Sequence, residues 1–181
     1  MYKRQYLATV TFRADGSSKF GKNNKWGYFP AVSAAWRIKE EKWLSNVRWL
    51  SDLKLRAGYG LAGNNRIGSY NSLALMNSIL AAMNGTLKPG YAVKNIPNPN
   101  LKWEANKTFN VGIDFGMLNQ RITVTPEFYI NESNDLLLNA QVPLSSGYAN
   151  MLLNAGATRN VGIDVAINTV NISNKDFSWR T

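Results

Sequence analysis

The stretch KWEANKTFNVGIDFGML, residues 102–118, alternates apolar and polar side chains along almost its whole length. From position 103 its odd positions are apolar except for Lys107, and its even positions up to 116 are charged, amide, hydroxyl or glycine residues. A period of two is typical of a β-strand with one apolar face. An ordinary strand is about 5–6 residues long, so this alternation predicts an unusually tall sheet.

The next stretch, residues 121–138, alternates in the same way, and only Asn119 and Gln120 separate the two. This spacing predicts a tight antiparallel hairpin in which Leu118 faces Arg121. Cross-strand pairs of this kind stabilise a sheet. The predicted pairs are Met117 with Ile122, Phe115 with Val124, Val111 with Phe128, Phe109 with Ile130 and Lys107 with Glu132. Pro126 lacks an N–H group, so we expect it at a bulge or where the ladder needs no donor.

The pentapeptide NVGID occurs twice, at residues 110–114 and 160–164, with its copies 50 residues apart. The interval holds a strand, a turn, a returning strand and a loop, so the second copy lies in a strand parallel in direction to the first. Residues 154–170 form this third strand, whose apolar face is interrupted by Arg159. With similar patterns at 5–13, 26–38 and 50–63, and a strand starting at Phe177, the sequence predicts an all-β, antiparallel up-and-down sheet of about seven strands.

The predicted connections alternate in length. Three long ones, residues 15–25, 63–101 and 139–153, lie at one end of the strands. At the other end, residues 119–120 and 171–176 form short turns and residues 39–50 form a longer connection. Long loops on one side and mostly short turns on the other are typical of an outer-membrane β-barrel.

Two connections contain apolar residues at helical spacing. One set predicts a helical turn within residues 39–50, and the other predicts a short amphipathic helix within residues 73–85, packed on its own loop or against a partner. The first set is Trp43, Leu44 and Val47, and the second is Met76, Ile79, Leu80 and Met83.

The large aromatic residues favour a membrane wall over a soluble sandwich. Trp26 and Trp36 share a face ten residues apart, a length of roughly 33 Å along a strand. Tilted as in a barrel, this length projects to roughly 25 Å, the height of the apolar band between two aromatic girdles. Trp103 and Phe115 are predicted to repeat the arrangement. A sandwich core has no reason to place Trp at both margins.

The composition excludes several classes of site. The 181-residue chain has no Cys and no His, which removes disulfides, thiolate metal sites, cysteine nucleophiles and His-based triads. The formal net charge is +10, but the basic residues are spread from Lys3 to Arg180, whereas nucleic-acid footprints cluster. No run reaches the roughly 18 apolar residues of a membrane helix, and the start lacks the apolar region of a signal peptide.

The residues left for chemistry are carboxylates on the polar face. Asp114 and Asp164 occupy equivalent positions in the two NVGID copies and form the remaining candidate pair for acid–base catalysis. We expect them instead to hydrogen-bond wall or plug groups, and we predict no catalytic, cofactor-binding or metal-binding residue. The glycines of this face relieve crowding or let a plug or neighbouring side chains approach the wall. They are Gly58, Gly60, Gly112, Gly116, Gly156 and Gly162.

Four motifs occur in order: DGSSKFG (15–21), KWGYFPAVSAAW (25–36), NPNLKWE (98–104) and NVGID. In this order they resemble the C-terminal barrel of SusC/RagA-type TonB-linked outer-membrane transporters, over nearly the whole chain. The resemblance implies a barrel of about 22 strands around an N-terminal plug, in the outer membrane of a Gram-negative bacterium. It also implies contact with membrane lipids, a SusD-like lipoprotein lid that helps to capture glycans or peptides, and import driven by TonB through the plug.

The chain departs from that family by omission, since no signal peptide, TonB box or plug is recognisable. A single-chain bacterial barrel needs eight or more strands, so we expect residues 1–181 to be a partial barrel domain. Lys107 and Glu132 are then expected on the outer wall near the extracellular margin. The alternative is a secreted, soluble β-sheet module that binds carbohydrate or nucleic acid on a Trp and Lys platform, and such a module would be a soluble monomer. The resemblance favours the importer over this module, and we expect no nucleic-acid partner.

Overall fold

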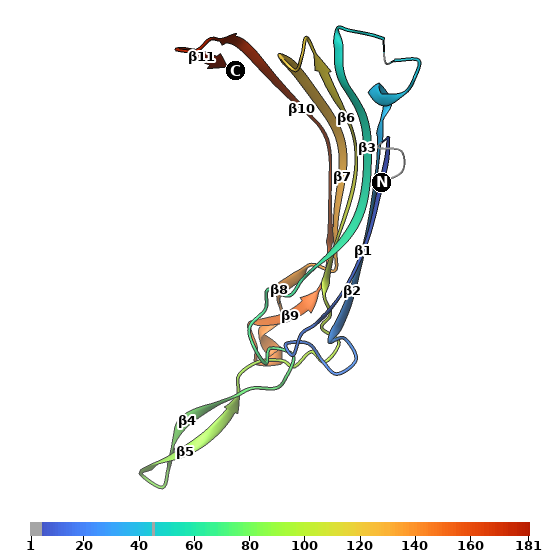
Figure 1. Ribbon diagram of the computed structural model, residues 1–181. Coiled ribbons are helices and arrows are strands. Elements are labelled where there is room, and N and C mark those ends of the chain that lie inside the picture. Colours follow the sequence, from blue (N-terminus) through green and yellow to red (C-terminus); the bar gives the residue numbers. More distant parts are fainter. Residues whose placement is uncertain (1–4, 45) are drawn as a thin grey trace.

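The computed structural model describes residues 5–44 and 46–181. Its main feature is a seven-stranded antiparallel sheet in the order β1-β2-β3-β6-β7-β10-β11. This confirms the prediction of an antiparallel sheet of about seven strands. The strands are β1 (Tyr6–Gly16), β2 (Trp26–Arg37), β3 (Leu50–Asn64), β6 (Glu104–Met117), β7 (Ile122–Asn134), β10 (Ala157–Ser173) and β11 (Ser178–Arg180). Figure 1 shows this sheet as a tall, curved wall. It is an open up-and-down arrangement in which each long strand pairs with the next long strand of the chain.

The predicted register of the central hairpin is confirmed. Phe109 pairs with Ile130 and Lys107 with Glu132, as the alternation requires. The ladder ends at Met117 and Ile122, and the turn between them places three consecutive non-glycine residues, 118–120, in the left-handed region with φ from 51° to 64°. Opposite Pro126 the β6–β7 ladder is interrupted without a change of register, because proline has no N–H to donate.

The long connections form two further hairpins near the lower end of the wall in Figure 1. They are β4 (Met76–Met83) with β5 (Thr86–Val93), and β8 (Leu137–Gln141) with β9 (Asn150–Asn154). The amphipathic helix predicted within residues 73–85 is therefore wrong. Asn84 and Gly85 have φ of 53° and 74°, and an Asn-Gly pair with positive φ forms the tight turn of a hairpin.

Helical structure is confined to short 3-10 segments in the described residues. They are η1 (Ile38–Glu40) and η2 (Leu144–Ser146). The helical turn predicted within residues 39–50 is present as η1 and two following turns, which donate from Leu44 to the Glu41 carbonyl and from Val47 to the Leu44 carbonyl. No helix in the described part of the chain is long and apolar enough to cross a bilayer.

The sheet keeps one face apolar and leaves it uncovered by the described residues. Val10 is 80% exposed and Ile163 is 69% exposed on this face. Trp26 and Trp36 both lie on it, as predicted, and Trp36 stacks on Tyr6 at a ring-centroid distance of 6.2 Å. A water-soluble sandwich would bury such a face in its core, so the surface left uncovered by the described residues does not favour the sandwich interpretation.

The compact core lies instead among the connections at the loop end of the wall. Phe20, Ile67 and Leu101 are buried there, and Trp103 packs against them. The predicted place of Trp103 in an outward girdle is therefore wrong. The strand β6 begins one residue later, at Glu104, so the indole is free to turn into the core, where its Nε1 donates to the Lys25 carbonyl.

Candidate functional site

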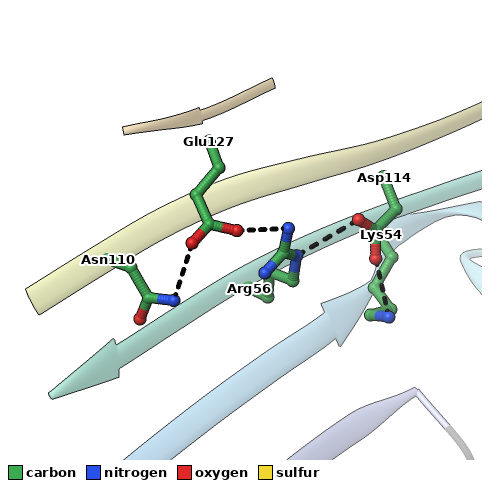
Figure 2. Close-up of polar contacts among 5 residues, drawn as sticks. All are labelled: Lys54, Arg56, Asn110, Asp114 and Glu127. Atoms are coloured by element: carbon green, nitrogen blue, oxygen red, sulfur yellow. Dashed lines mark hydrogen bonds and ion pairs between the residues drawn. The ribbon is translucent and has the colours of Figure 1, made fainter. Parts of the chain in front are cut away.

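A chain of charged side chains crosses the polar face of the wall (Figure 2). Arg56 of β3 lies between Asp114 of β6 and Glu127 of β7, contacting Asp114 Oδ1 through Nε at 3.1 Å and Glu127 Oε2 through Nη2. Lys54 Nζ reaches the other Asp114 oxygen at 2.7 Å, and Asn110 donates from Nδ2 to Glu127 at 3.0 Å. These five residues form what we call the wall network.

The wall network follows from strand alternation and register. Lys54 and Arg56 are alternate residues of β3, and Asn110 and Asp114 are four apart on β6, so each set points to the same face. Lys54 pairs with Asp114 across the β3–β6 ladder, which brings opposite charges together. Two cations meet two carboxylates, so the cluster is neutral, and its charged side chains are a quarter to a third exposed.

Glycines leave room for these side chains. A Cβ added at Gly112 would stand 3.0 Å from Arg56 Nη2, and one added at Gly162 would stand 2.5 Å from the Tyr129 hydroxyl. Both glycines are the central residue of an NVGID copy. The expectation that neighbouring side chains approach the wall at its glycines is confirmed here, and it explains why the repeat keeps a residue without a side chain at this point.

The structure does not bring Asp114 and Asp164 together. Asp114 lies on β6 and Asp164 on β10, with the whole of β7 between them. Asp114 binds wall groups as expected, whereas Asp164 lies opposite Glu127 in the register and makes no ion pair with any residue the structure describes. Of the two candidate carboxylates, only Asp114 belongs to the wall network, so the structure does not form the candidate pair.

No metal site is evident in the described residues, which contain no group of three His, Cys, Asp or Glu side chains placed to hold an ion. The wall network was not predicted from the sequence, although the alternation within residues 50–63 puts Lys54 and Arg56 on the same polar face. The missing information was the β3–β6 register, because a connection of almost forty residues separates the two strands and no short turn sets their pairing.

A second cluster joins two of the sequence motifs at the loop end. Phe20 of DGSSKFG packs on Trp103 of NPNLKWE at a ring-centroid distance of 5.3 Å. A Cβ at Gly21 would collide with the Pro99 carbonyl oxygen, so the segment DGSSKFG needs a glycine here to lie against NPNLKWE. Asn98 donates to the Leu152 carbonyl at 3.0 Å. The two motifs therefore tie three loops into one rim.

Asn154 and Glu104 extend the rim to the β8–β9 hairpin. Asn154 accepts from the Lys102 amide and donates to the Lys102 and Asp135 carbonyls, each at 2.9 Å. Glu104 accepts from Asn64 and from the Leu137 amide. These bonds satisfy backbone groups of irregular loops, which holds the loop end in a defined shape.

Comparison with known proteins gives the same architecture. The family model described as TonB dependent receptor-like, beta-barrel matches residues 3–181. The TonB-dependent receptor SusC of Bacteroides thetaiotaomicron is 42% identical over 97% of this chain and 18% of its own length. The TonB-dependent receptor P26 of Formosa agariphila is 35% identical over 99% of this chain and 18% of its own length.

Solved structures agree with these relatives. The RagAB peptide importer in its closed-closed state superposes with a TM-score of 0.88 at 32% identity, covering 97% of this chain and 19% of that chain. The siderophore receptor PirA of Pseudomonas aeruginosa shares the fold with a TM-score of 0.62 at 18% identity, over 99% of this chain and 30% of that one. The chain thus spans about a fifth of the length of SusC, P26 and the RagAB chain. Its sequence match and its fold both show that it belongs to the TonB-dependent receptor β-barrel family.

Proposed function

We propose that this chain forms part of the lipid-facing wall of a TonB-dependent outer-membrane receptor. The uncovered apolar face of the seven-stranded sheet carries this proposal. The strands β2, β3, β6, β7 and β10 have 12 to 17 residues, and a tilted strand needs about 9–11 residues to cross a bilayer. The opposite face, with its neutral wall network, suits a hydrated interior.

The receptors of this family are outer-membrane proteins of Gram-negative bacteria, and we propose the same location here. The outer strands β1 and β11 each have one edge unpaired within the described residues, and such edges are not stable in lipid. Further strands of a larger barrel, of about 22 strands in all, would satisfy them. Residues 1–181 would then be a partial barrel domain, with the plug elsewhere in the receptor.

The relatives support an import function with a large nutrient as cargo. One solved relative is described as a peptide importer, and another relative is SusC. We propose that the receptor imports glycans or peptides, assisted by a SusD-like lipoprotein at the loop end and by TonB acting through the plug. The rim would then shape the extracellular mouth.

This role needs no catalysis, metal or cofactor from the chain. The neutral wall network would stabilise the wall, and the rim would hold the loops. The alternative of a secreted soluble module that binds carbohydrate or nucleic acid is disfavoured, because such a module would not expose Val10 and Ile163 to water in a continuous apolar face.

The test is nutrient uptake by cells that depend on the full-length receptor. Radiolabelled oligosaccharide and peptide panels are offered to cells with the receptor, without it, and with the receptor but without TonB. Uptake of at least one panel should require both the receptor and TonB. Normal uptake without TonB would contradict energised import, and hydrolysis of a panel by the purified receptor would favour an enzyme.

A further inference from the structure

Three neighbouring strands change from apolar to charged at the same position on the lipid-facing side. Going toward the loop end, the aligned row Phe109, Ile130 and Val161 is followed by a row of three charged residues. That row consists of Lys107 on β6, Glu132 on β7 and Arg159 on β10. We call it the charged row. The charged row interrupts the apolar face on three neighbouring strands in one aligned row, whereas unrelated surface charges would fall in different rows.

The charges in this row are not fully matched. Glu132 Oε1 lies 3.3 Å from Arg159 Nε. The Arg159 side chain is 63% exposed. Lys107 faces Glu132 in the register but makes no ion pair in the described residues. The charged row therefore has a net charge of +1 and an unpaired ammonium.

Apolar residues lie directly beside these cations. A shallow depression of about 290 Å³ is lined by Tyr59, Lys107, Phe109, Ile130, Glu132 and Arg159. Its aromatic and aliphatic side suits hydrocarbon, and its charged side suits an anion. A ligand that matches both is an amphiphile with a negative head.

We propose that Lys107 and Arg159 bind a phosphate group of lipopolysaccharide in the outer leaflet, with its acyl chains lying over Phe109 and Ile130. This inference rests on the proposed function, which places the apolar face in the outer membrane with the long loops outside. A guanidinium and an ammonium at the end of an apolar band match the level of lipid phosphates.

The position of the row fits a bilayer boundary. Charge on the lipid face of a barrel is costly at mid-membrane and nearly free of cost near the interface. Each residue of the row lies two or three positions from the loop-side end of its strand, at Glu104, Asn134 and Ala157. The charged row is thus tolerated where lipid head groups begin, and the head groups supply the missing anion.

The test uses the full-length receptor purified in detergent, freed of lipid and titrated with lipid A by native mass spectrometry. The double variant Lys107→Gln, Arg159→Gln should bind lipid A about thirtyfold more weakly, since each basic side chain near a lipid surface contributes about 1 kcal/mol. Lys88→Gln, on the β4–β5 hairpin away from the row, is the matched control and should bind normally. Glu132→Gln should bind at least as tightly as the unmodified receptor, because it removes a negative charge.

Three further measurements separate this proposal from others. Dephosphorylated lipid A should bind the unmodified receptor as weakly as phosphorylated lipid A binds the double variant. Inorganic phosphate should not compete, and competition would assign the site to a free anion. The double variant should still take up nutrient, because the proposed import function does not depend on the charged row. Unchanged lipid A binding by this variant would overturn the lipid inference and leave the proposed function standing.

Discussion

The guanidinium of Arg56 lies directly over Gly112, whose missing side chain leaves the space that Arg56 occupies. Gly112→Val should displace Arg56 from both carboxylates and lower the stability of the barrel by about 1–3 kcal/mol. The measurement is the temperature at which the folded barrel unfolds on a detergent gel. Gly90→Ala, where the nearest atom to an added Cβ is 3.7 Å away, is the control and should have little effect. An unchanged barrel in Gly112→Val would show that the wall tolerates a side chain there.

Arg56 should matter more than Lys54 for the wall network. Arg56 contacts two carboxylates and Lys54 contacts one, so Arg56→Gln should cost about 1–3 kcal/mol and Lys54→Gln less. A double-mutant cycle with Glu127→Gln isolates the Arg56–Glu127 contact and should give a coupling of about 0.5–3 kcal/mol. A coupling of zero would mean that the pair contributes only to geometry.

The rim should collapse when its buried aromatic residue is removed. Phe20 is 2% exposed, and Phe20→Ala should destabilise the loop end by about 3–5 kcal/mol. The expected result is faster proteolysis within residues 63–101 with the transmembrane wall intact. Leu144→Ala, at a residue 82% exposed, serves as the control. Equal proteolysis in both variants would contradict a rim built around Phe20.

The β4–β5 hairpin should be dispensable for the wall. Its two strands pair only with each other among the described residues. Replacing residues 76–93 with a short Gly-Ser linker should therefore leave barrel assembly unchanged. If the proposed SusD-like lipoprotein docks at the loop end, the same change should weaken its co-purification. Assembly is read from the gel shift and lid association from affinity capture. Failed assembly would mean that the hairpin supports the wall, and unchanged capture would place the lid contact elsewhere.

Much of the wall was predictable because a strand repeats every two residues. The pairing of Lys107 with Glu132 followed from one alternation and one short turn. The helix predicted at residues 73–85 failed because the spacing of Met76, Ile79 and Met83 fits a helix, whereas the turn chemistry of Asn84–Gly85 favours a hairpin. Turn residues with positive φ should have been given more weight than a short apolar spacing.

The wall network could not be predicted for a different reason. Arg56 and Asp114 lie on strands joined by a long connection, and only the three-dimensional pairing of β3 with β6 brings them together. Trp103 shows the same limit at a strand end, where a shift of one residue moved a large side chain from the lipid face into the rim. Sequence alternation defines faces well, but it defines long-range register and strand ends poorly.

The most direct test of the account is the environment of alternate residues on β10. The chain has no cysteine, so single cysteines in a cysteine-free full-length receptor can carry spin labels at 161, 163, 165 and 167, and at 160, 164 and 168. In outer-membrane vesicles the odd positions should be relaxed by lipid-soluble oxygen and the even positions by a water-soluble nickel chelate. This period of two is the result that a lipid-facing wall predicts. Equal access of the nickel chelate to both sets would contradict the interpretation as a lipid-facing wall and would favour a soluble sheet.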